Sequence, residues 1–410
     1  MVNAFRKTAR GLVTVAALAA TCLPGFAQGI SGDVVKIGVM NDQSGPYADN
    51  CGPGAVAAVR LAVQDHGGAI AGKKIEVLVA DDQNKPDVGL GTALRWLDTD
   101  GVDVIVGCSA SSIALAVSDL MEQRKKPYIL AGTASTALTN DKCTPMNTQW
   151  IQDIYALPKA IVKSLLGQGL DTWFFVTVDY SFGKDWQAET TRFLEQGGAK
   201  VVGSVLHPLN SSDFSSFLVR AQASKAKVIA LANSGSDLSN VLKQASEFGI
   251  SGSGQTMAPL GLFINAVHGI GLQALQNVNL TTPFYWNLND ETRAFSKRFG
   301  AAFNDRIPNE AQASTYSAVN HYLKAVAAAG TDEGEAVMKT MREMPVDDAT
   351  MKGVKIRADG QVMRPVYAAR IKTPAQSKGP YDYYDITGTL SPEDVFRPAS
   401  ESSCKLLKTQ

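Results

Sequence analysis

Short apolar runs alternate along the chain with longer segments in which apolar residues recur every three or four positions. The runs at 34–40, 75–80 and 102–107 predict buried strands, and the segments 55–64 and 88–97 predict helices that bury one face. This alternation favours a parallel sheet with helices on both sides, joined by right-handed crossovers. The first part of the chain is therefore predicted to be a doubly wound α/β unit.

The same alternation restarts near Asp153 and defines a second unit. Strand-like runs at 173–178, 201–205 and 228–232 are separated by helical segments. A further helical region covers 311–329, and the C-terminal part is richer in proline and aromatic residues, which favours hairpins and a tail. The sequence therefore predicts an α/β protein with two doubly wound, parallel-sheet lobes.

The lobes are expected to exchange segments, because no low-complexity linker separates the two units. Lobe 1 is assigned to 33–153 with 284–352, lobe 2 to 154–283 with 353–398, and a C-terminal tail to 399–410. The chain then crosses between the lobes near Asp153, Pro283 and Lys352, which predicts a three-strand hinge.

The N-terminus has the pattern of an export signal. Arg6, Lys7 and Arg10 precede an apolar stretch at 12–23, which is too short to span a membrane, and a small-x-small sequence ends at Ala27. Residues 1–27 are therefore predicted to be a signal peptide, which places the mature chain in the periplasm. A lipoprotein site at Cys22 is disfavoured because Thr21 is a poor residue to precede a lipidated cysteine.

Cleavage after Ala27 leaves Cys51, Cys108, Cys143 and Cys404. An even number of cysteines in an exported chain favours two disulfides, with three possible pairings. Cys51 and Cys108 both fall just after apolar strands, whose ends could meet at one edge of a sheet, so Cys51–Cys108 with Cys143–Cys404 is the favoured pairing. Four free buried thiols are the alternative. A zinc site is disfavoured because the chain has no CxxC and its four histidines are scattered.

The charge balance disfavours a nucleic-acid partner. The chain has 39 Lys and Arg against 39 Asp and Glu, and no basic stripe indicates nucleic acid. Gly67–Lys74 has the glycine and lysine spacing of a phosphate-binding loop, but Lys74 replaces the Ser/Thr that holds magnesium and the segment precedes a strand. It is predicted to be a turn. No cofactor or metal is expected, and the protein is expected to be a monomer.

Small residues occupy the step from the strand at 102–107 to the next helix. Ser109, Ser111 and Ser112 stand there with Ala110, at the carboxyl end of a predicted parallel strand, where ligands bind in open α/β sheets. Unpaired N–H groups at a helix start suit an anion, and serine hydroxyls add donors. An anion clamp and ordinary helix capping by Ser111 or Ser112 both fit this pattern. A hydrolase using Ser109 as nucleophile is an alternative of another class, although the closing glycine of that motif is missing.

Four sequence blocks carry a resemblance to a known family. They are "VVKIGVMNDQSGPYAD", "GGAIAGKKIEVLVADDQNKPD", "DVIVGCSASSIALAVSD" and "DYSFGKDW". In order and spacing they resemble the type I periplasmic solute-binding proteins of the leucine/isoleucine/valine-binding family, over nearly the whole mature chain. The resemblance implies a receptor, not an enzyme, that closes two lobes on a small molecule and delivers it to the membrane permease of an ABC importer.

The resemblance also implies which residues bind the ligand. The ligand's carboxylate is expected to bind at Ala110, Ser111 and Ser112, beside Ser109. Ala134 or Ser135 is expected to complete the first-lobe site. Tyr47 falls in the first pocket loop, Phe182 aligns with a second-lobe aromatic residue, and Asn233 and Ser234 fall in a second-lobe loop.

One departure from the family pattern bears on the ligand. Amino-acid binders place an acidic residue in the second lobe against the ammonium group, and here Leu260 stands in its place. A buried ammonium without a counter-charge is strongly disfavoured. Leu260, Leu262 and Phe263, with Phe182 and Tyr47, would instead form an apolar slot suited to a flat ring.

The expected ligand is therefore a small apolar carboxylate, most of all an aromatic acid of benzoate or hydroxycinnamate type. The whole chain also resembles the aromatic-acid-uptake branch of the family. A branched-chain amino acid is the alternative within the family, and it requires an acid elsewhere in the pocket. A periplasmic sensory domain remains a further alternative, whereas a transcriptional regulator is disfavoured because no helix-turn-helix precedes Val34.

Overall fold

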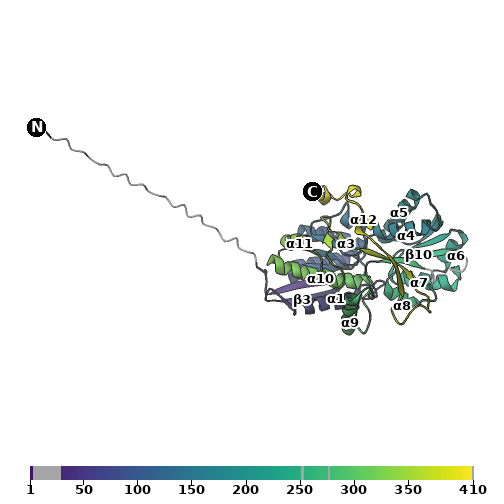
Figure 1. The fold of residues 1–410 in the computed structure, drawn as a ribbon, viewed down its shortest axis with the longest axis horizontal. Helices are drawn as coiled ribbons and strands as arrows, with labels where there is room; N and C mark the ends of the chain where they lie inside the picture. The colour runs from purple at the N-terminus through teal and green to yellow at the C-terminus, as the bar shows by residue number, and fades with distance from the viewer. Residues whose placement is uncertain (3–28, 251–253, 276–277, 409–410) are drawn as a thin grey trace.

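The computed structural model describes residues 1–2, 29–250, 254–275 and 278–408, and it has two lobes side by side (Figure 1). The predicted signal peptide, apart from its first two residues, lies outside the described residues. In the described part of the chain, no helix is both long and apolar enough to cross a membrane.

The first lobe is built on a sheet with the strand order β2-β3-β1-β4-β5-β6. Its strands are β1 (Val34–Asn41), β2 (Ala69–Ile70), β3 (Lys73–Asp81), β4 (Val104–Gly107), β5 (Tyr128–Leu130) and β6 (Asn147–Gln149). They run parallel except β2, which forms an antiparallel hairpin with β3. The predicted turn at Gly67–Lys74 is this hairpin.

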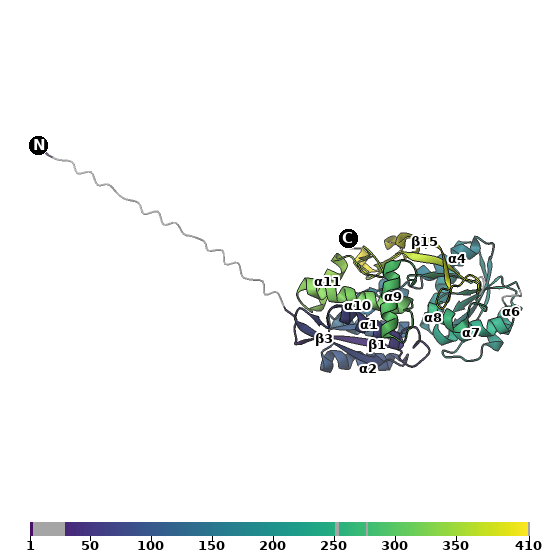
Figure 2. The ribbon, with the colours of Figure 1, turned by 60° about the horizontal axis from the view of Figure 1, so that its bottom comes forward.

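Helices cover both faces of the first sheet. One face carries α1 (Gly52–Asp65), α9 (Asp290–Ala302), α10 (Glu310–Ala329) and α11 (Gly334–Glu343), and the other carries α2 (Pro86–Arg95) and α3 (Ser111–Gln123) (Figure 2). Successive side chains of a strand point to opposite faces, so Val104 and Val106 pack under α1 and α10 while Ile105 packs against α3. A strand buried on both faces is therefore apolar throughout, as the sequence shows.

The second lobe repeats this arrangement on a sheet with the order β10-β9-β7-β8. Its strands are β7 (Thr172–Val178), β8 (Lys200–His207), β9 (Val228–Ala232) and β10 (Thr256–Pro259). One face is covered by α6 (Ser215–Ala223), α7 (Gly235–Glu247) and α8 (Ile264–Ile270), and the other by α4 (Ala156–Leu166) and α5 (Ser181–Gln196). The predicted fold class, two parallel-sheet α/β lobes, is confirmed.

A third, antiparallel sheet packs apolar side chains into the core of the second lobe, and its last strand is labelled near α4 in Figure 2. It consists of β11 (Asn279–Thr282), β14 (Val366–Ile371) and β15 (Tyr384–Leu390), and the short elements β12 (Lys355–Ile356), β13 (Val362–Met363) and α12 (Pro392–Val395) flank it in sequence. The core changes from lobe 1 to lobe 2 between Trp150 and Ile154, and back between Leu280 and Phe284.

The third change of lobe lies further along the chain than the expected position near Lys352. Val354, Ile356 and Val362 pack in the core of the first lobe, because the β12–β13 hairpin turns its apolar side chains toward α11. The segment at 353–362 therefore belongs with lobe 1 rather than lobe 2.

Two disulfides fasten the first lobe, in the pairing that the sequence favours. Cys51–Cys108 joins the start of α1 to the end of β4, with Cα atoms 6.0 Å apart. Cys143–Cys404, with Cα atoms 5.7 Å apart, ties the C-terminal segment to the first lobe. The Ser403 N–H also donates to Asn140 Oδ1 at 2.7 Å. The segment at 399–408 is thus packed on the first lobe.

Candidate functional site

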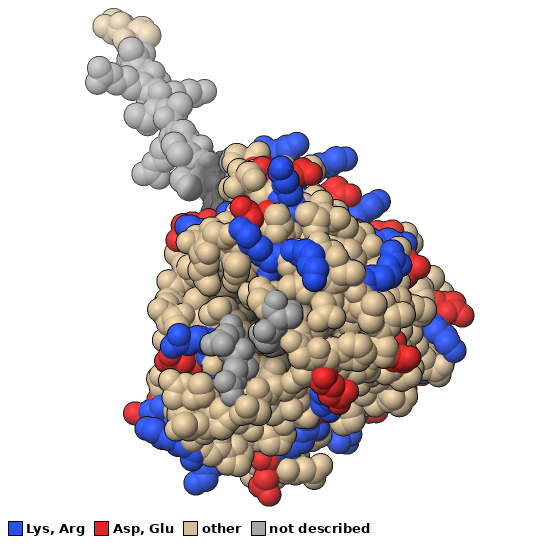
Figure 3. Space-filling model, turned by 90° about the vertical axis from the view of Figure 1, so that its right-hand side faces the viewer, with Lys and Arg blue, Asp and Glu red and all other residues tan. Residues whose placement is uncertain are grey.

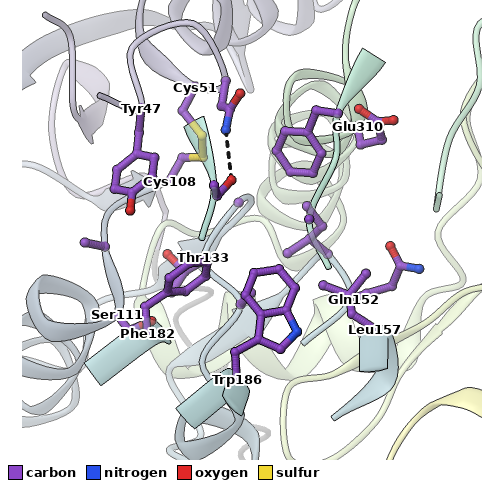
Figure 4. Close-up of a pocket in the computed structure, with 18 of the residues that line it drawn as sticks. Tyr47, Cys51, Cys108, Ser111, Thr133, Gln152, Leu157, Phe182, Trp186 and Glu310 are labelled. Atoms are coloured by element: carbon purple, nitrogen blue, oxygen red, sulfur yellow. Dashed lines mark hydrogen bonds between the residues drawn. A yellow bond between two sulfur atoms is a disulfide. The ribbon is translucent and has the colours of Figure 1, made fainter. Parts of the chain in front are cut away.

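A pocket lies between the lobes, where strand ends and helix starts from both sheets meet (Figure 4). Its empty volume, which includes the open mouth, is about 740 Å³. This is the position at which open parallel sheets bind ligands, because the loops at the carboxyl ends of the strands converge there. Among the described residues, no group of three or more His, Cys, Asp or Glu is arranged to hold a metal ion.

The start of α3 forms one wall of the pocket. Ala110 is the N-cap residue and no side chain caps this helix, so neither Ser111 nor Ser112 acts as the cap. The side chain of Ser111 is 2% exposed and lines the pocket, and its Oγ has no hydrogen-bond partner among the described residues. A buried hydroxyl beside the unpaired N–H groups of a helix start is a site for an anion.

Ser109 also lines the pocket, but its hydroxyl is already used. Ser109 Oγ donates to the Met40 carbonyl at 3.1 Å, and the Thr133 hydroxyl donates to the Ser109 carbonyl at 2.7 Å. These bonds hold the loop between β4 and α3 against its neighbours. No histidine is among the described residues of the pocket wall.

Aromatic rings form another part of the pocket wall. Phe182 meets Trp186 edge to face at 4.9 Å between ring centroids, and it stacks on Tyr180 at 5.7 Å. Phe263 stands at the start of α8 and also lines the pocket, as does Leu157. Edge-to-face and offset geometries of this kind accept a further flat ring.

The prediction that Leu260 lines the pocket is wrong. This side chain is 1% exposed and lies in the core of the second lobe, away from the pocket, whereas Gly261, Leu262 and Phe263 line the pocket. The shift is one residue, which is enough to turn a side chain to the other side of an extended segment. A Cβ atom on Gly261 would lie 2.5 Å from the Cη2 atom of Trp186. The indole therefore fills the space that a side chain at 261 would need.

The other predicted residues divide into two groups. Those that line the pocket are Tyr47, Ser109, Ala110, Ser111, Ala134, Phe182, Ser234 and Phe263. Ser112, Ser135 and Asn233 do not. Ser112 follows Ser111 on the helix and faces another direction, Ser135 is fully buried, and Asn233 bonds with its Nδ2 to His207 Nε2 at 3.1 Å.

Sequence reasoning missed part of the wall. The missed residues are Asn50, Gly132, Thr133, Ile151, Gln152, Leu157, Tyr180, Trp186, Gly261, Thr281, Pro283 and Glu310, together with Cys51 and Cys108 as wall residues. Tyr180 and Trp186 stand inside the block "DYSFGKDW", which carried the resemblance and could have indicated them. Gln152 stands beside the predicted crossing at Asp153. Glu310 had no signal of its own.

The two lobes touch at the mouth of the pocket. The hydroxyls of Tyr47 and Tyr180 share a hydrogen bond of 2.7 Å, and Asn50 Nδ2 donates to Ser234 Oγ at 3.3 Å. The Ser236 N–H donates to the Pro46 carbonyl at 3.0 Å. Burial raises the pKa of both tyrosines, so both phenols stay neutral and either hydroxyl can donate to the other. The lobes are therefore in a closed arrangement.

A buried carboxyl group joins the first lobe to the hinge. Glu310 Oε1 accepts from the hydroxyls of Thr282 at 3.1 Å and Tyr384 at 3.3 Å, and Oε2 accepts from the Ile264 N–H at 3.3 Å. Burial raises the pKa of Glu310 to about 7, and the hydrogen bonds that it accepts oppose this rise. The start of α10 is thereby fixed to β11, β15 and the start of α8.

This carboxyl group predicts a pH dependence of stability. The folded state binds the proton of Glu310 more tightly than the unfolded chain, so its contribution to the free energy of unfolding falls as pH rises from 4.5 through about 7. Asp153 and Asp237, whose pKa burial raises to about 6, act in the same direction. The free energy of unfolding in urea should therefore fall less between pH of about 5 and about 8 for Glu310→Gln than for the wild type. Glu122→Gln, at an exposed position of α3, is the control, and an equal loss in all three proteins contradicts the assignment.

Gly132 predicts a second change in stability. A Cβ atom on Gly132 would collide with Cys108 Sγ, so Gly132→Ala must displace the disulfide and the loop before α3. The free energy of unfolding should fall by about 1–3 kcal/mol, as for other overpacked sites. Gly91→Ala, in open space on exposed α2, should instead raise it by about 0.5–1 kcal/mol. Equal thermal unfolding of the two variants would refute the packing of Gly132 against the disulfide.

Charged side chains on the face of the second lobe in Figure 3 are interspersed, with basic and acidic residues close to one another. The ion pairs Lys184–Asp179 and Lys227–Asp171, in the second lobe, have N–O distances of 2.8 and 2.9 Å. This face therefore presents no field of a single sign.

Comparison with known proteins gives a consistent family match. A family model described as periplasmic binding protein matches residues 34–380. The Leu/Ile/Val-binding protein homolog 6 of Brucella abortus (strain 2308) is 26% identical over 230 residues, which are 55% of this chain and 58% of that protein. The match thus spans less than two thirds of that relative's length.

Solved structures are similar over most of the chain. A periplasmic binding protein from Burkholderia mallei is 42% identical, with a TM-score of 0.88 over 91% of this chain and 99% of that one. A branched chain amino acid ABC transporter periplasmic ligand-binding protein from Burkholderia xenovorans LB400 is 37% identical, with a TM-score of 0.80 over 91% and 100%. A solute binding protein of an ABC transporter from Rhodopseudomonas palustris BisB5, in complex with 3,4-dihydroxy benzoic acid, is 22% identical, with a TM-score of 0.81 over 90% and 100%. The last likeness concerns the fold alone.

Proposed function

Because the chain belongs to the periplasmic binding protein family, we propose that it captures a small aromatic monocarboxylate in the periplasm and delivers it to the membrane permease of an ABC transporter. The ligand enters the pocket between the lobes, and the hinge strands allow the lobes to close on it. The closed form is the one presented to the permease.

The observation that supports this proposal is that one pocket offers both a hydrogen-bond donor for a carboxylate and an aromatic surface for a ring. Ser111 offers a buried, unpartnered hydroxyl at the start of α3, which suits a carboxylate. Phe182 and Trp186 form an aromatic surface on the same pocket wall, which suits a flat ring. An aromatic acid has a carboxylate and a flat ring within one small molecule.

The same geometry disfavours an ammonium group in the second lobe. Gly261 has no side chain, and Trp186 occupies the space where one would stand. The buried acid on the wall, Glu310, already accepts three hydrogen bonds from the protein. A ligand ammonium would thus find no uncommitted carboxylate among the described wall residues, and burying it unpaired costs several kcal/mol.

A branched-chain amino acid is the second candidate. It is supported by the 37% identical structure, which is that of a branched chain amino acid ABC transporter periplasmic ligand-binding protein, and by the similarity to a Leu/Ile/Val-binding protein homolog of Brucella abortus. On this alternative, Glu310 would exchange one of its hydrogen bonds for the ligand ammonium, and the apolar wall would hold the aliphatic side chain.

A thermal-shift screen of the mature protein separates the two candidates. The panel consists of benzoates, hydroxycinnamates and aliphatic amino acids, and a ligand at a hundred times its dissociation constant should add about 2.7 kcal/mol of stability. We expect stabilisation by aromatic acids. Stabilisation by leucine, isoleucine or valine with none by aromatic acids contradicts the proposal.

A further inference from the structure

The start of α7, a helix of the second lobe, is capped by the first lobe. Its N-cap residue, Ser234, makes no capping hydrogen bond with its side chain. The N–H of Ser236, the second residue of the helix, donates instead to the Pro46 carbonyl of the first lobe at 3.0 Å. The Ser234 hydroxyl is also turned to the first lobe, because it accepts from Asn50 Nδ2 at 3.3 Å. The start of α7 therefore takes from the other lobe the bonds that a helix start otherwise finds in its own side chains or in water.

Gly235 lets the two lobes come this close. Its φ angle is +64°, and a Cβ atom on it would collide with the Pro46 carbonyl oxygen and lie 2.8 Å from Cδ1 of Tyr47. Outside its own helix backbone and chain neighbours, the three nearest atoms to this position all belong to the first lobe. A side chain at 235 would therefore obstruct the closed arrangement, whereas none of these contacts exists when the lobes are apart.

These contacts lie on the side of the pocket away from the hinge. Figure 4 shows Tyr47 across the pocket from Gln152, which stands beside the first crossing between the lobes. The hydroxyl of Tyr47 is bonded there to that of Tyr180 in the second lobe. A hinge rotation moves atoms further apart the further they lie from the hinge, so opening of the lobes must break these contacts.

We propose that the contacts between the loop after β1 and the second lobe are a latch that holds the lobes closed, and that Gly235 allows the latch to engage. The latch residues are Pro46, Tyr47 and Asn50 in the first lobe, with Tyr180, Ser234 and Ser236 in the second. The latch consists of protein atoms alone, so it favours closure before a ligand adds its own contacts. The affinity of the protein then depends in part on contacts that the ligand does not make. This inference concerns closure and does not require the ligand to be an aromatic acid.

Gly235→Ala tests the latch through the shape of the ligand-free protein. Gly198→Ala is the matched control, because Gly198 lies in the same lobe with a φ angle of +75° and has open space at its Cβ position. Both changes put alanine in the left-handed region, but only the one at 235 meets the first lobe. Small-angle X-ray scattering of the mature protein should give a larger radius of gyration for Gly235→Ala than for the wild type and Gly198→Ala. Equal radii in all three proteins, or the same increase in both variants, would overturn the latch.

Amide hydrogen exchange of the ligand-free wild type tests the latch without any variant. The protection factor of the Ser236 N–H should exceed that of the Ser216 N–H at least about tenfold, because the lobes must open before Ser236 exchanges. Ser216 holds the same second position in α6, and its N–H has no hydrogen-bond acceptor among the described residues. Equal protection of the two amides contradicts the latch, and this result stands even if Gly235→Ala does not fold.

Ligand affinity gives a third readout. Titration calorimetry with 4-hydroxybenzoate should show a loss of about tenfold or more for Gly235→Ala, since the fraction of closed protein is reduced. Gly198→Ala should keep the wild-type affinity. Wild-type affinity in Gly235→Ala would overturn the inference. If 4-hydroxybenzoate binds to none of the three proteins, the proposed function fails, whereas scattering and exchange still decide the latch.

Discussion

Gly261→Asp is expected to weaken the binding of an aromatic acid by about a hundredfold or more, because the new side chain collides with Trp186 and brings a carboxylate into an apolar wall. The Cβ atom alone would lie 2.5 Å from the indole, so the ring must leave its position. Titration calorimetry with benzoate and 4-hydroxybenzoate measures the effect.

Gly269→Asp is the matched control for this variant. Gly269 is exposed on α8, and a Cβ atom there would meet open space. Its affinity should equal that of the wild type. If Gly261→Asp also binds aromatic acids as the wild type does, Trp186 does not define the ring site and the argument against an ammonium at this wall is lost.

The second large effect is expected at Ser111. Ser111→Ala removes one charge-assisted hydrogen bond to the carboxylate, worth about 1.5–3 kcal/mol, so affinity should fall about tenfold to a hundredfold. The fold should survive, since alanine fits where serine does and the hydroxyl has no partner within the described residues. The N–H groups at the start of α3 remain, which is why binding should weaken rather than vanish.

Ser112→Ala is the control for Ser111→Ala. Ser112 is the next residue of the same helix, half-buried and outside the pocket wall. Calorimetry should give it the wild-type dissociation constant. Equal losses of affinity in the two variants would mean that the Ser111 hydroxyl affects binding through the helix and not through a bond to the ligand.

Local patterns were sufficient to predict the lobes and the start of α3. Strands buried on both faces are apolar throughout, so Val104, Ile105 and Val106 indicated a strand of a parallel sheet without any tertiary information. The small residues that follow marked the strand-to-helix step at which Ser111 stands. Such patterns depend only on neighbouring residues, and the folded structure agrees with them.

The rest of the pocket wall could not be predicted with the same precision. Leu260 and Gly261 differ by one position, and which of them faces the pocket depends on how the chain leaves β10. Gln152, Thr281 and Glu310 come from three separate segments that only the hinge brings together. No local pattern marks them, since each would read as an ordinary polar residue near the end of an element.

The most direct test is titration calorimetry of the wild-type mature protein with 4-hydroxybenzoate and with leucine, in the same buffer. The structure predicts saturable binding of 4-hydroxybenzoate, with leucine bound at least about a hundredfold more weakly, because a buried ammonium without a free carboxylate is strongly disfavoured. Tight binding of leucine with no heat from 4-hydroxybenzoate or benzoate would contradict the aromatic-acid account and establish the amino-acid reading in its place.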